Sequence, residues 1–178
     1  MSTSSAKMLV FVGAKCVCIK ISGRANFTSS IDFKTLVNEL MQQGRDYFVL
    51  DLSECTLMDS TFLGVLAGFG LKVNSPQPNE PQRTIELFNP NARISDLLEN
   101  LGVLHLFKVQ QGAAVCLPEE TAPHDLTPAN PSRETVTQTC LEAHRTLMDL
   151  HPDNVARFKD VAAFLAEDLK KLKAAGSS

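Results

Sequence analysis

The residues best suited to chemistry are the hydroxyls of an Asp59-Ser60-Thr61 triplet. The triplet lies in VLDLSECTLMDSTFLGVLAGFG, residues 49–70, where a hydrophobic strand to Leu52 and a short polar turn precede an apolar helix. This order predicts that Ser60 and Thr61 lie at a helix N-terminus, where unpaired N–H groups and the helix dipole favour an anion. A phosphate would be stabilised at this helix start and would change the charge of an apolar surface. The pattern therefore indicates a phosphorylation switch more than a catalyst.

Other signals for catalysis or metal binding are weak. The sequence has no phosphate-binding loop, dinucleotide fingerprint, nucleophile elbow or zinc-protease helix. Ser60 has no obvious neighbouring base that would make it a nucleophile. The histidines are scattered between a strand, a linker and the tail, at positions 105, 124, 144 and 151. We therefore predict a protein that is not an enzyme, with no catalytic residues, no metal site and no cofactor.

The composition predicts one domain of ordinary size with an extension. The 178 residues are 44% hydrophobic, which is enough to bury a core, and the net charge is −3. The absence of a basic patch argues against binding to nucleic acid. Five cysteines without a paired CxxC spacing indicate reduced thiols in the cytoplasm. The apolar runs are too short for a secretory leader or a membrane span, so we predict a cytoplasmic protein without membrane insertion.

The first 110 residues predict alternating strands and helices, from hydrophobic periodicity and from turn and cap signals. The expected elements are strands over 8–13, 15–21 and 47–52, a loop over 22–26, a helix capped by Ser29 or Ser30 and ended by Gly44, a helix over 61–74, a strand over 83–88, a helix capped by Asn89-Pro90 and ended by Gly102, and a strand over 104–109. The order β-β-α-β-α-β-α-β predicts an α/β fold in which helices pack on a mixed sheet. A further short strand over 113–117 is possible.

The tail differs in kind from this first part. Residues 118–131 contain four prolines and predict a linker, after a domain over residues 8–117. Residues 132–174 then carry apolar positions at 4-3-4-3 spacing on both sides of His151-Pro152-Asp153, which predicts a C-terminal α-helical hairpin. Its narrow apolar seams can pack on the domain or can form a surface for a dimer or a partner.

Two segments resemble one known family when they are taken together. The first is a strand and polar turn followed by MDS-x-x-LGVL at Met58–Leu66, and the second is NPNARISDLLENLGVLHLF at 89–107. Over roughly residues 8–110 the chain looks like a STAS domain. It is most similar to the bacterial anti-sigma factor antagonists. The resemblance implies a STAS-type fold and a regulatory role in transcription.

The resemblance also implies a switch mechanism. In that family an ATP-dependent serine kinase, which is also the anti-sigma factor, phosphorylates the hydroxyl residue directly after the Asp, and a serine phosphatase reverses the modification. On this sequence Ser60 is the acceptor, Asp59 precedes it, and Thr61 and Leu63 flank it. Gly64 occupies the small position that lets the partner approach. The protein would then bind the kinase when unmodified and so release a sigma factor.

Two residues depart from the family pattern near the acceptor. Phe62 stands where many relatives have Gly, and its ring could change partner choice or fill a pocket on the partner. Asn26 stands where an acidic residue often follows the early glycine loop, which leaves less negative charge around the acceptor. We include both in the expected partner-binding set. On a docking surface beside Phe62 and Leu63, a phosphate on Ser60 would be desolvated and would repel nearby acids.

Alternatives to the switch remain open from the sequence. Ser60 could be a plain helix N-cap without any modification. The chain could be a STAS adaptor or scaffold subunit of a larger complex, such as a lipid-transport or signalling assembly, in which no phosphorylation is needed. The anion-friendly helix start could also bind a nucleotide or another small ligand.

Overall fold

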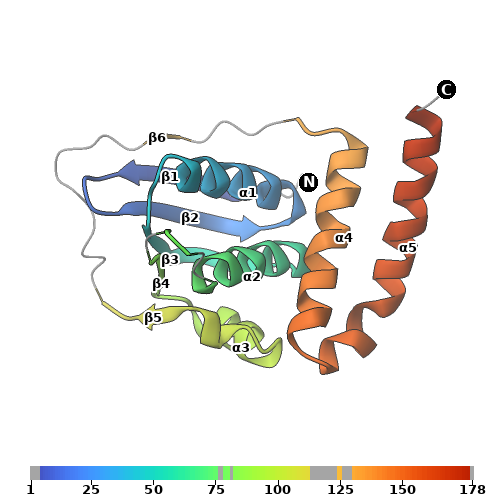
Figure 1. Ribbon diagram of the computed structural model, residues 1–178. Coiled ribbons are helices and arrows are strands. Elements are labelled where there is room, and N and C mark those ends of the chain that lie inside the picture. The colour runs from blue at the N-terminus through green and yellow to red at the C-terminus, as the bar shows by residue number, and fades with distance from the viewer. Residues whose placement is uncertain (1–4, 76–77, 81, 113–123, 126–129, 177–178) are drawn as a thin grey trace.

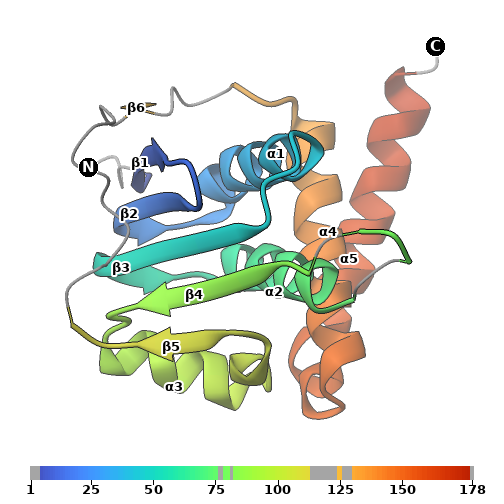
Figure 2. The same cartoon turned by 60° about the vertical axis from the view of Figure 1, so that its left-hand side comes forward.

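The computed structural model describes residues 5–75, 78–80, 82–112, 124–125 and 130–176. Within these ranges one sheet has the strand order β5-β4-β3-β2-β1-β6 (Figures 1 and 2). The elements in chain order are β1 (Lys7–Val12), β2 (Val17–Ala25), α1 (Phe27–Gln42), β3 (Tyr47–Met58), α2 (Ser60–Asn74), β4 (Thr84–Phe88), α3 (Ala92–Asn100), the 3-10 helix η1 (Leu104–Leu106), β5 (Lys108–Gln110), β6 (His124–Asp125), α4 (Arg133–Leu150) and α5 (Asp153–Gly176).

The sheet is mixed, as the order of elements predicts. β2, β3, β4 and β5 are parallel, and each successive pair is joined by a helical crossover. β1 is antiparallel to β2, and the two-residue β6 is antiparallel to β1. Helices α1 and α2 lie side by side on one face of the sheet (Figure 1). The expected α/β fold with a C-terminal helical hairpin is confirmed.

The main core lies between the sheet and these helices. In β3, Phe48, Leu50 and Leu52 point into this core, since alternate residues of a strand share a face. Val49 points to the other face, where it joins a small cluster with Cys18 and Phe88. Every central residue of β3 is therefore buried, which explains its nearly continuous apolar sequence.

The two strands that end beside the Asp-Ser-Thr triplet, β2 and β3, are longer than we predicted. β3 continues through the expected polar turn as far as Met58, and β2 continues through the expected loop as far as Ala25. The two strands pair from Val17 opposite Phe48 to Ala25 opposite Met58, so pairing keeps the polar residues extended. Register shifts interrupt this pairing on either side of Ser22 and Gly23.

Several predicted caps and ends also shift. The N-cap of α1 is Asn26 instead of Ser29 or Ser30, which both lie in the first turn, and the N-cap of α3 is Asn91 instead of Asn89-Pro90. The strand expected over 104–109 is divided into η1 and the short β5, because Leu106 and Phe107 turn into the core. β6 lies within the predicted linker, and the possible strand over 113–117 lies outside the described residues.

The C-terminal hairpin packs on the domain through its first helix. α4 packs across α2, and α5 lies on the outer side of α4 in both views (Figures 1 and 2). The seam between α4 and α5 buries Leu141, Ala162 and Leu169. Ala162 and Leu169 are predicted seam positions, but Leu141 is not, because the predicted α4 positions Ala143 and Leu147 pack into the main core of the domain instead. Of the two alternatives for the hairpin, α4 therefore shows the first, which is packing on the domain. A homodimer through these helices stays a prediction, as do the boundaries at residues 117 and 131.

Candidate functional site

The site forms where two neighbouring parallel strands end at the same edge of the sheet. β2 ends at Ala25 and β3 ends at Met58, and these two residues are paired in the register. The amide of Asp59 donates to the carbonyl of Ala25 at 2.9 Å, which continues the pairing by one residue. As a result, α1 and α2 both begin here, and their N-termini lie together.

Asp59 caps both helices with one carboxylate. Its Oδ1 accepts from the amide of Phe62 at 2.8 Å, which caps α2, and its Oδ2 accepts from the amide of Phe27 at 2.7 Å, at the first residue of α1. Two charge-assisted bonds fix the carboxylate and the backbone around Ser60. The side chain that the family pattern places before the acceptor is therefore a structural bridge between two helix starts.

Asn26 is committed to its own helix. Its Oδ1 accepts from the amide of Ser29 at 3.1 Å, and the Ser29 hydroxyl accepts from the Asn26 amide at 2.9 Å. This reciprocal pair is a capping box, which satisfies two amides at the start of α1. Asn26 lies near Asp59 because its neighbour Phe27 bonds to that carboxylate.

Ser60 is the first residue of α2 and is half-buried. Its Oγ lies 2.9 Å from Nε2 of His144, which belongs to α4. The other ring nitrogen of His144, Nδ1, lies 2.6 Å from the backbone carbonyl of Cys140. Because a carbonyl only accepts, Nδ1 carries the proton in the neutral ring, Nε2 is the acceptor, and the Ser60 hydroxyl donates to it.

Thr61 is placed differently from Ser60. Its side chain is only 5% exposed, and its hydroxyl donates to Sγ of Cys140 at 3.6 Å. Burial raises the pKa of the Cys140 thiol above its ordinary value, the hydrogen bond from Thr61 lowers it, and the Asp59 carboxylate raises it. The thiol therefore stays protonated at neutral pH. Of the two hydroxyls, that of Ser60 is the more accessible.

Phe62 and Leu63 lie in the core instead of on the surface where we expected them. Phe62 is 0% exposed and its ring packs 5.2 Å, centroid to centroid, from Phe33 of α1. Leu63 is 2% exposed and belongs to the same core. The helix is apolar on most sides, so its sequence does not show which side faces the sheet. A docking surface in this conformation therefore excludes these two side chains.

Gly64 has the close neighbour that its small size permits, and this neighbour is in the same chain. A Cβ at position 64 would lie 2.4 Å from the carbonyl oxygen of Ala143 in α4. Only glycine allows the two helix backbones to approach so closely. The position expected to admit a partner is occupied by the protein's own α4.

Two residues of the site were missed from the sequence. His144 is 84 residues from Ser60, and its only signal was a polar side chain beside the apolar seam of the tail. Phe27 is 46% exposed at the start of α1, next to Asp59. The sequence carried no signal for it, because the predicted cap was Ser29 or Ser30 and Phe27 fell between that cap and the predicted loop.

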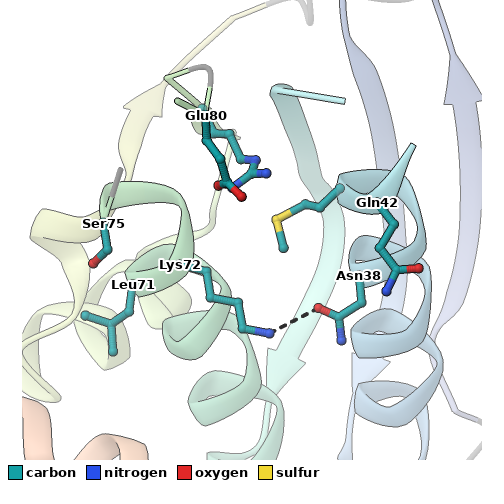
Figure 3. Close-up of a pocket in the computed structure, with 8 residues that line it drawn as sticks. Asn38, Gln42, Leu71, Lys72, Ser75 and Glu80 are labelled. Atoms are coloured by element: carbon teal, nitrogen blue, oxygen red, sulfur yellow. Dashed lines mark hydrogen bonds and ion pairs between the residues drawn. The ribbon is translucent and has the colours of Figure 1, made fainter. Parts of the chain in front are cut away.

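A shallow pocket lies at the far ends of α1 and α2, away from Ser60. Figure 3 shows Asn38 and Gln42 on one side and Leu71, Lys72 and Ser75 on the other. The Lys72 ammonium donates to the Asn38 side chain at 3.2 Å, as the dashed line marks, and Arg83 pairs with Glu80 at 2.9 Å. Both cations therefore already have partners. Because this pocket lies away from Ser60, nucleotide binding at the helix start of Ser60 stays a prediction.

Within the part of the chain that the structure describes, no three His, Cys, Asp or Glu side chains lie together as a metal-binding group. Among these same residues, no helix has the length and apolar composition to cross a bilayer.

The sequence matches the STAS domain family over residues 10–114, which is more than half of the chain. The chain therefore belongs to the STAS domain family. Among solved structures, it is similar to the anti-sigma factor antagonist SpoIIAA in its unphosphorylated form. That similarity has 15% sequence identity and a TM-score of 0.49, and it covers 60% of this chain and 89% of that chain. No curated protein matches the sequence.

Proposed function

We propose that the protein is a phosphorylation-switched regulatory protein of the anti-sigma factor antagonist type, with Ser60 as the acceptor. The observation that carries this proposal is the hydroxyl of the half-buried Ser60 at the first residue of α2, directly after the Asp59 cap. Its partners are an anti-sigma factor that is a serine kinase and a serine phosphatase, in the cytoplasm of a bacterium. Its role is regulation of transcription by protein binding, without catalysis.

A phosphate on Ser60 would act through charge at a crowded junction. It adds about −1.5 to −2 charges and three acceptor oxygens. The N-terminal dipole of α2 favours this charge, whereas the Asp59 carboxylate repels it. A partner that buries the site would have to desolvate the phosphate, at a cost of about 2–5 kcal/mol, or roughly 30- to several-thousand-fold in affinity.

The surface that supports partner binding is the rim of the two helix starts. It consists of Asn26, Phe27, Asp59 and Ser60. Phe27 exposes 46% of its surface there, and aromatic side chains are frequent anchors of protein interfaces. Four residues of the predicted set are not part of this rim. Thr61 is only 5% exposed, and the core and α4 occupy Phe62, Leu63 and Gly64.

The test is phosphorylation by a serine kinase of the histidine-kinase-like ATPase type from the same organism. With Mg-ATP, intact-mass and peptide analysis should show one phosphate on Ser60 in the wild type and none in Ser60→Ala. Ser60→Asp should bind the kinase at least 30-fold more weakly, and Ser75→Asp, which adds the same charge at the exposed far end of α2, should bind normally. Equal binding by Ser60→Asp and the wild type would exclude the switch.

A second function is supported by one observation, the packing of α4 on α2. Because α4 already covers that helix, the domain could serve as an unmodified STAS adaptor in a larger assembly. Purification from the native host separates the two functions. Co-purification with a membrane ATPase and no phosphate on Ser60 under growth or stress would support the adaptor.

A further inference from the structure

The contact between Ser60 and His144 has the geometry of a nucleophile and its base. The Ser60 hydroxyl donates to Nε2 of His144 at 2.9 Å, within the range over which a base takes a proton from an attacking hydroxyl. His144 is 6% exposed, while Ser60 is half-buried. The hydroxyl proton of the half-buried Ser60 therefore points to a ring that is sheltered from solvent.

Two contacts hold the imidazole in the orientation that this chemistry requires. The Cys140 carbonyl accepts from Nδ1 at 2.6 Å, which leaves the lone pair on Nε2 facing Ser60. The ring also packs against Phe158 of α5, with centroids 5.2 Å apart and planes at 65°. Both helices of the hairpin thus orient one side chain, as the third group of a catalytic triad orients its histidine.

The position of Ser60 on α2 favours the charge that the reaction would create. Ser60 is the first residue of the helix, and Asp59 already caps the amide of Phe62. The positive end of the helix dipole favours a serine oxygen that gains negative charge and then a phosphoryl group attached to it. Gly64 lies one turn along α2 from Ser60, and Ala143 directly precedes His144 in α4. The close packing of Ala143 on Gly64 therefore fixes α4 beside the pair.

We propose that Ser60 and His144 form a nucleophile–base pair, so that the C-terminal hairpin supplies the proton acceptor for phosphoryl transfer to Ser60. The biological role of this pair rests on the proposed function, but its chemistry does not require the kinase. In the phosphorylation reaction, the Ser60 Oγ attacks the terminal phosphorus of the nucleoside triphosphate that the kinase holds, and an Oγ–P bond forms. The bond from phosphorus to the nucleoside diphosphate breaks, the diphosphate leaves with the electron pair, and the hydroxyl proton moves to Nε2 of His144.

The pair can be tested without a kinase by using diisopropyl fluorophosphate as the phosphorus electrophile. In that reaction the Oγ–P bond forms, the P–F bond breaks, fluoride leaves and His144 takes the proton. Intact-mass and peptide analysis should show one label on Ser60 in the full-length wild type and none on Ser60 in Ser60→Ala. His144→Gln should label roughly a hundredfold more slowly, which is within the usual contribution of a general base. His105→Gln, which changes an exposed histidine on η1, should label at the wild-type rate.

A second measurement does not depend on the folding of a variant. Nitrogen NMR of the wild-type histidine side chains should show His144 protonated on Nδ1 alone before labelling. Labelling of Ser60 should remove the hydrogen bond to Nε2 and change the His144 signals, and those of His105 should stay unchanged. A wild-type Ser60 that the reagent does not label, or a folded His144→Gln that labels at the wild-type rate, would overturn the proposal.

The outcomes also separate this inference from the proposed function. If the kinase phosphorylates Ser60 but the reagent labels His144→Gln as fast as the wild type, the switch stands and the base does not. If the reagent labels Ser60 through His144 but no kinase modifies it, the nucleophile–base pair stands and the antagonist function does not.

Discussion

Asp59 links the two helices that begin beside Ser60. It accepts hydrogen bonds from the amides of Phe62 and Phe27, so a single side chain satisfies one orphan amide in each of α2 and α1. The bridge also joins the end of β3 to the helix that follows β2. Asp59 therefore fixes the backbone beside Ser60, the proposed phosphorylation site, and this structural role is independent of phosphorylation.

We expect Asp59→Ala to lower the free energy of unfolding by about 2 kcal/mol, since it removes a cap and a second charge-assisted hydrogen bond. Asp59→Asn keeps one carbonyl oxygen and should lose about half as much. Urea unfolding measures both. Asp96→Ala, at an exposed position in α3, is the control and should change little, and an Asp59→Ala loss no larger than this control would contradict the bridging role.

Asn154 has a comparable role at the turn of the hairpin. Its Nδ2 donates to the carbonyls of Leu101 at 2.9 Å and Leu147 at 2.8 Å, and its side chain is completely buried. Asn154→Ala leaves two buried carbonyls without this donor and should cost about 2–4 kcal/mol of stability. Hydrogen exchange should show faster exchange in α4 and α5, whereas Asn100→Ala, at an exposed position, should leave it unchanged.

At the scale of elements, the contact of α2 with α4 depends on one glycine. Gly64→Ala and Gly68→Ala both add a methyl group to the same helix, and each raises its intrinsic helix propensity by about 1 kcal/mol. At position 64 the new Cβ would meet the Ala143 carbonyl at 2.4 Å, but at position 68 its nearest neighbour is a Thr146 methyl at 4.0 Å. We expect Gly64→Ala to lose about 2–3 kcal/mol through overpacking.

Gly68→Ala is the matched variant and should gain up to about 1 kcal/mol, because the propensity term acts without the clash. Thermal unfolding of the two variants measures the expected loss of stability in Gly64→Ala and the expected gain in Gly68→Ala. If Gly64→Ala were as stable as Gly68→Ala, α4 would not lie against α2 in solution.

The ion pair between Lys34 of α1 and Glu142 of α4 makes the docking of the hairpin sensitive to acid. Burial raises the pKa of Glu142, but hydrogen bonds from Lys34 at 2.8 Å and from Gln138 at 2.6 Å outweigh it and lower the pKa below the ordinary 4.5. A group with a lowered folded pKa stabilises the fold above its unfolded pKa, and this stability is lost as the pH falls through the folded pKa.

We therefore expect the wild type to lose stability more steeply than Glu142→Gln as the pH falls below about 4.5. Urea midpoints over an acid series measure the difference. Glu99→Gln, at an exposed position in α3, should follow the wild-type curve. Parallel curves for the wild type and Glu142→Gln would contradict the contribution of this pair.

The elements could be predicted where the signal is local. The helix from Ser60 to Asn74 follows from the Asp59 cap and a long apolar run. β3 could have been extended to Met58, because polar Glu54 and Thr56 alternate in the sequence with the less polar Cys55. His144 could not be assigned to the site, since its contact with Ser60 depends on where α4 packs. Phe62 was misplaced because only the packing of Phe33 shows which side of α2 is inward.

At the scale of the whole molecule, the chain passes from one edge of the sheet to the other. It leaves β5 at one edge and returns at β6, which pairs with β1 at the opposite edge before α4 begins. A fragment that ends at residue 117 would therefore lose both the hairpin and the strand that covers β1. Its uncovered backbone amides and carbonyls would form a template for another chain, so such a fragment should tend to exchange strands between copies or aggregate.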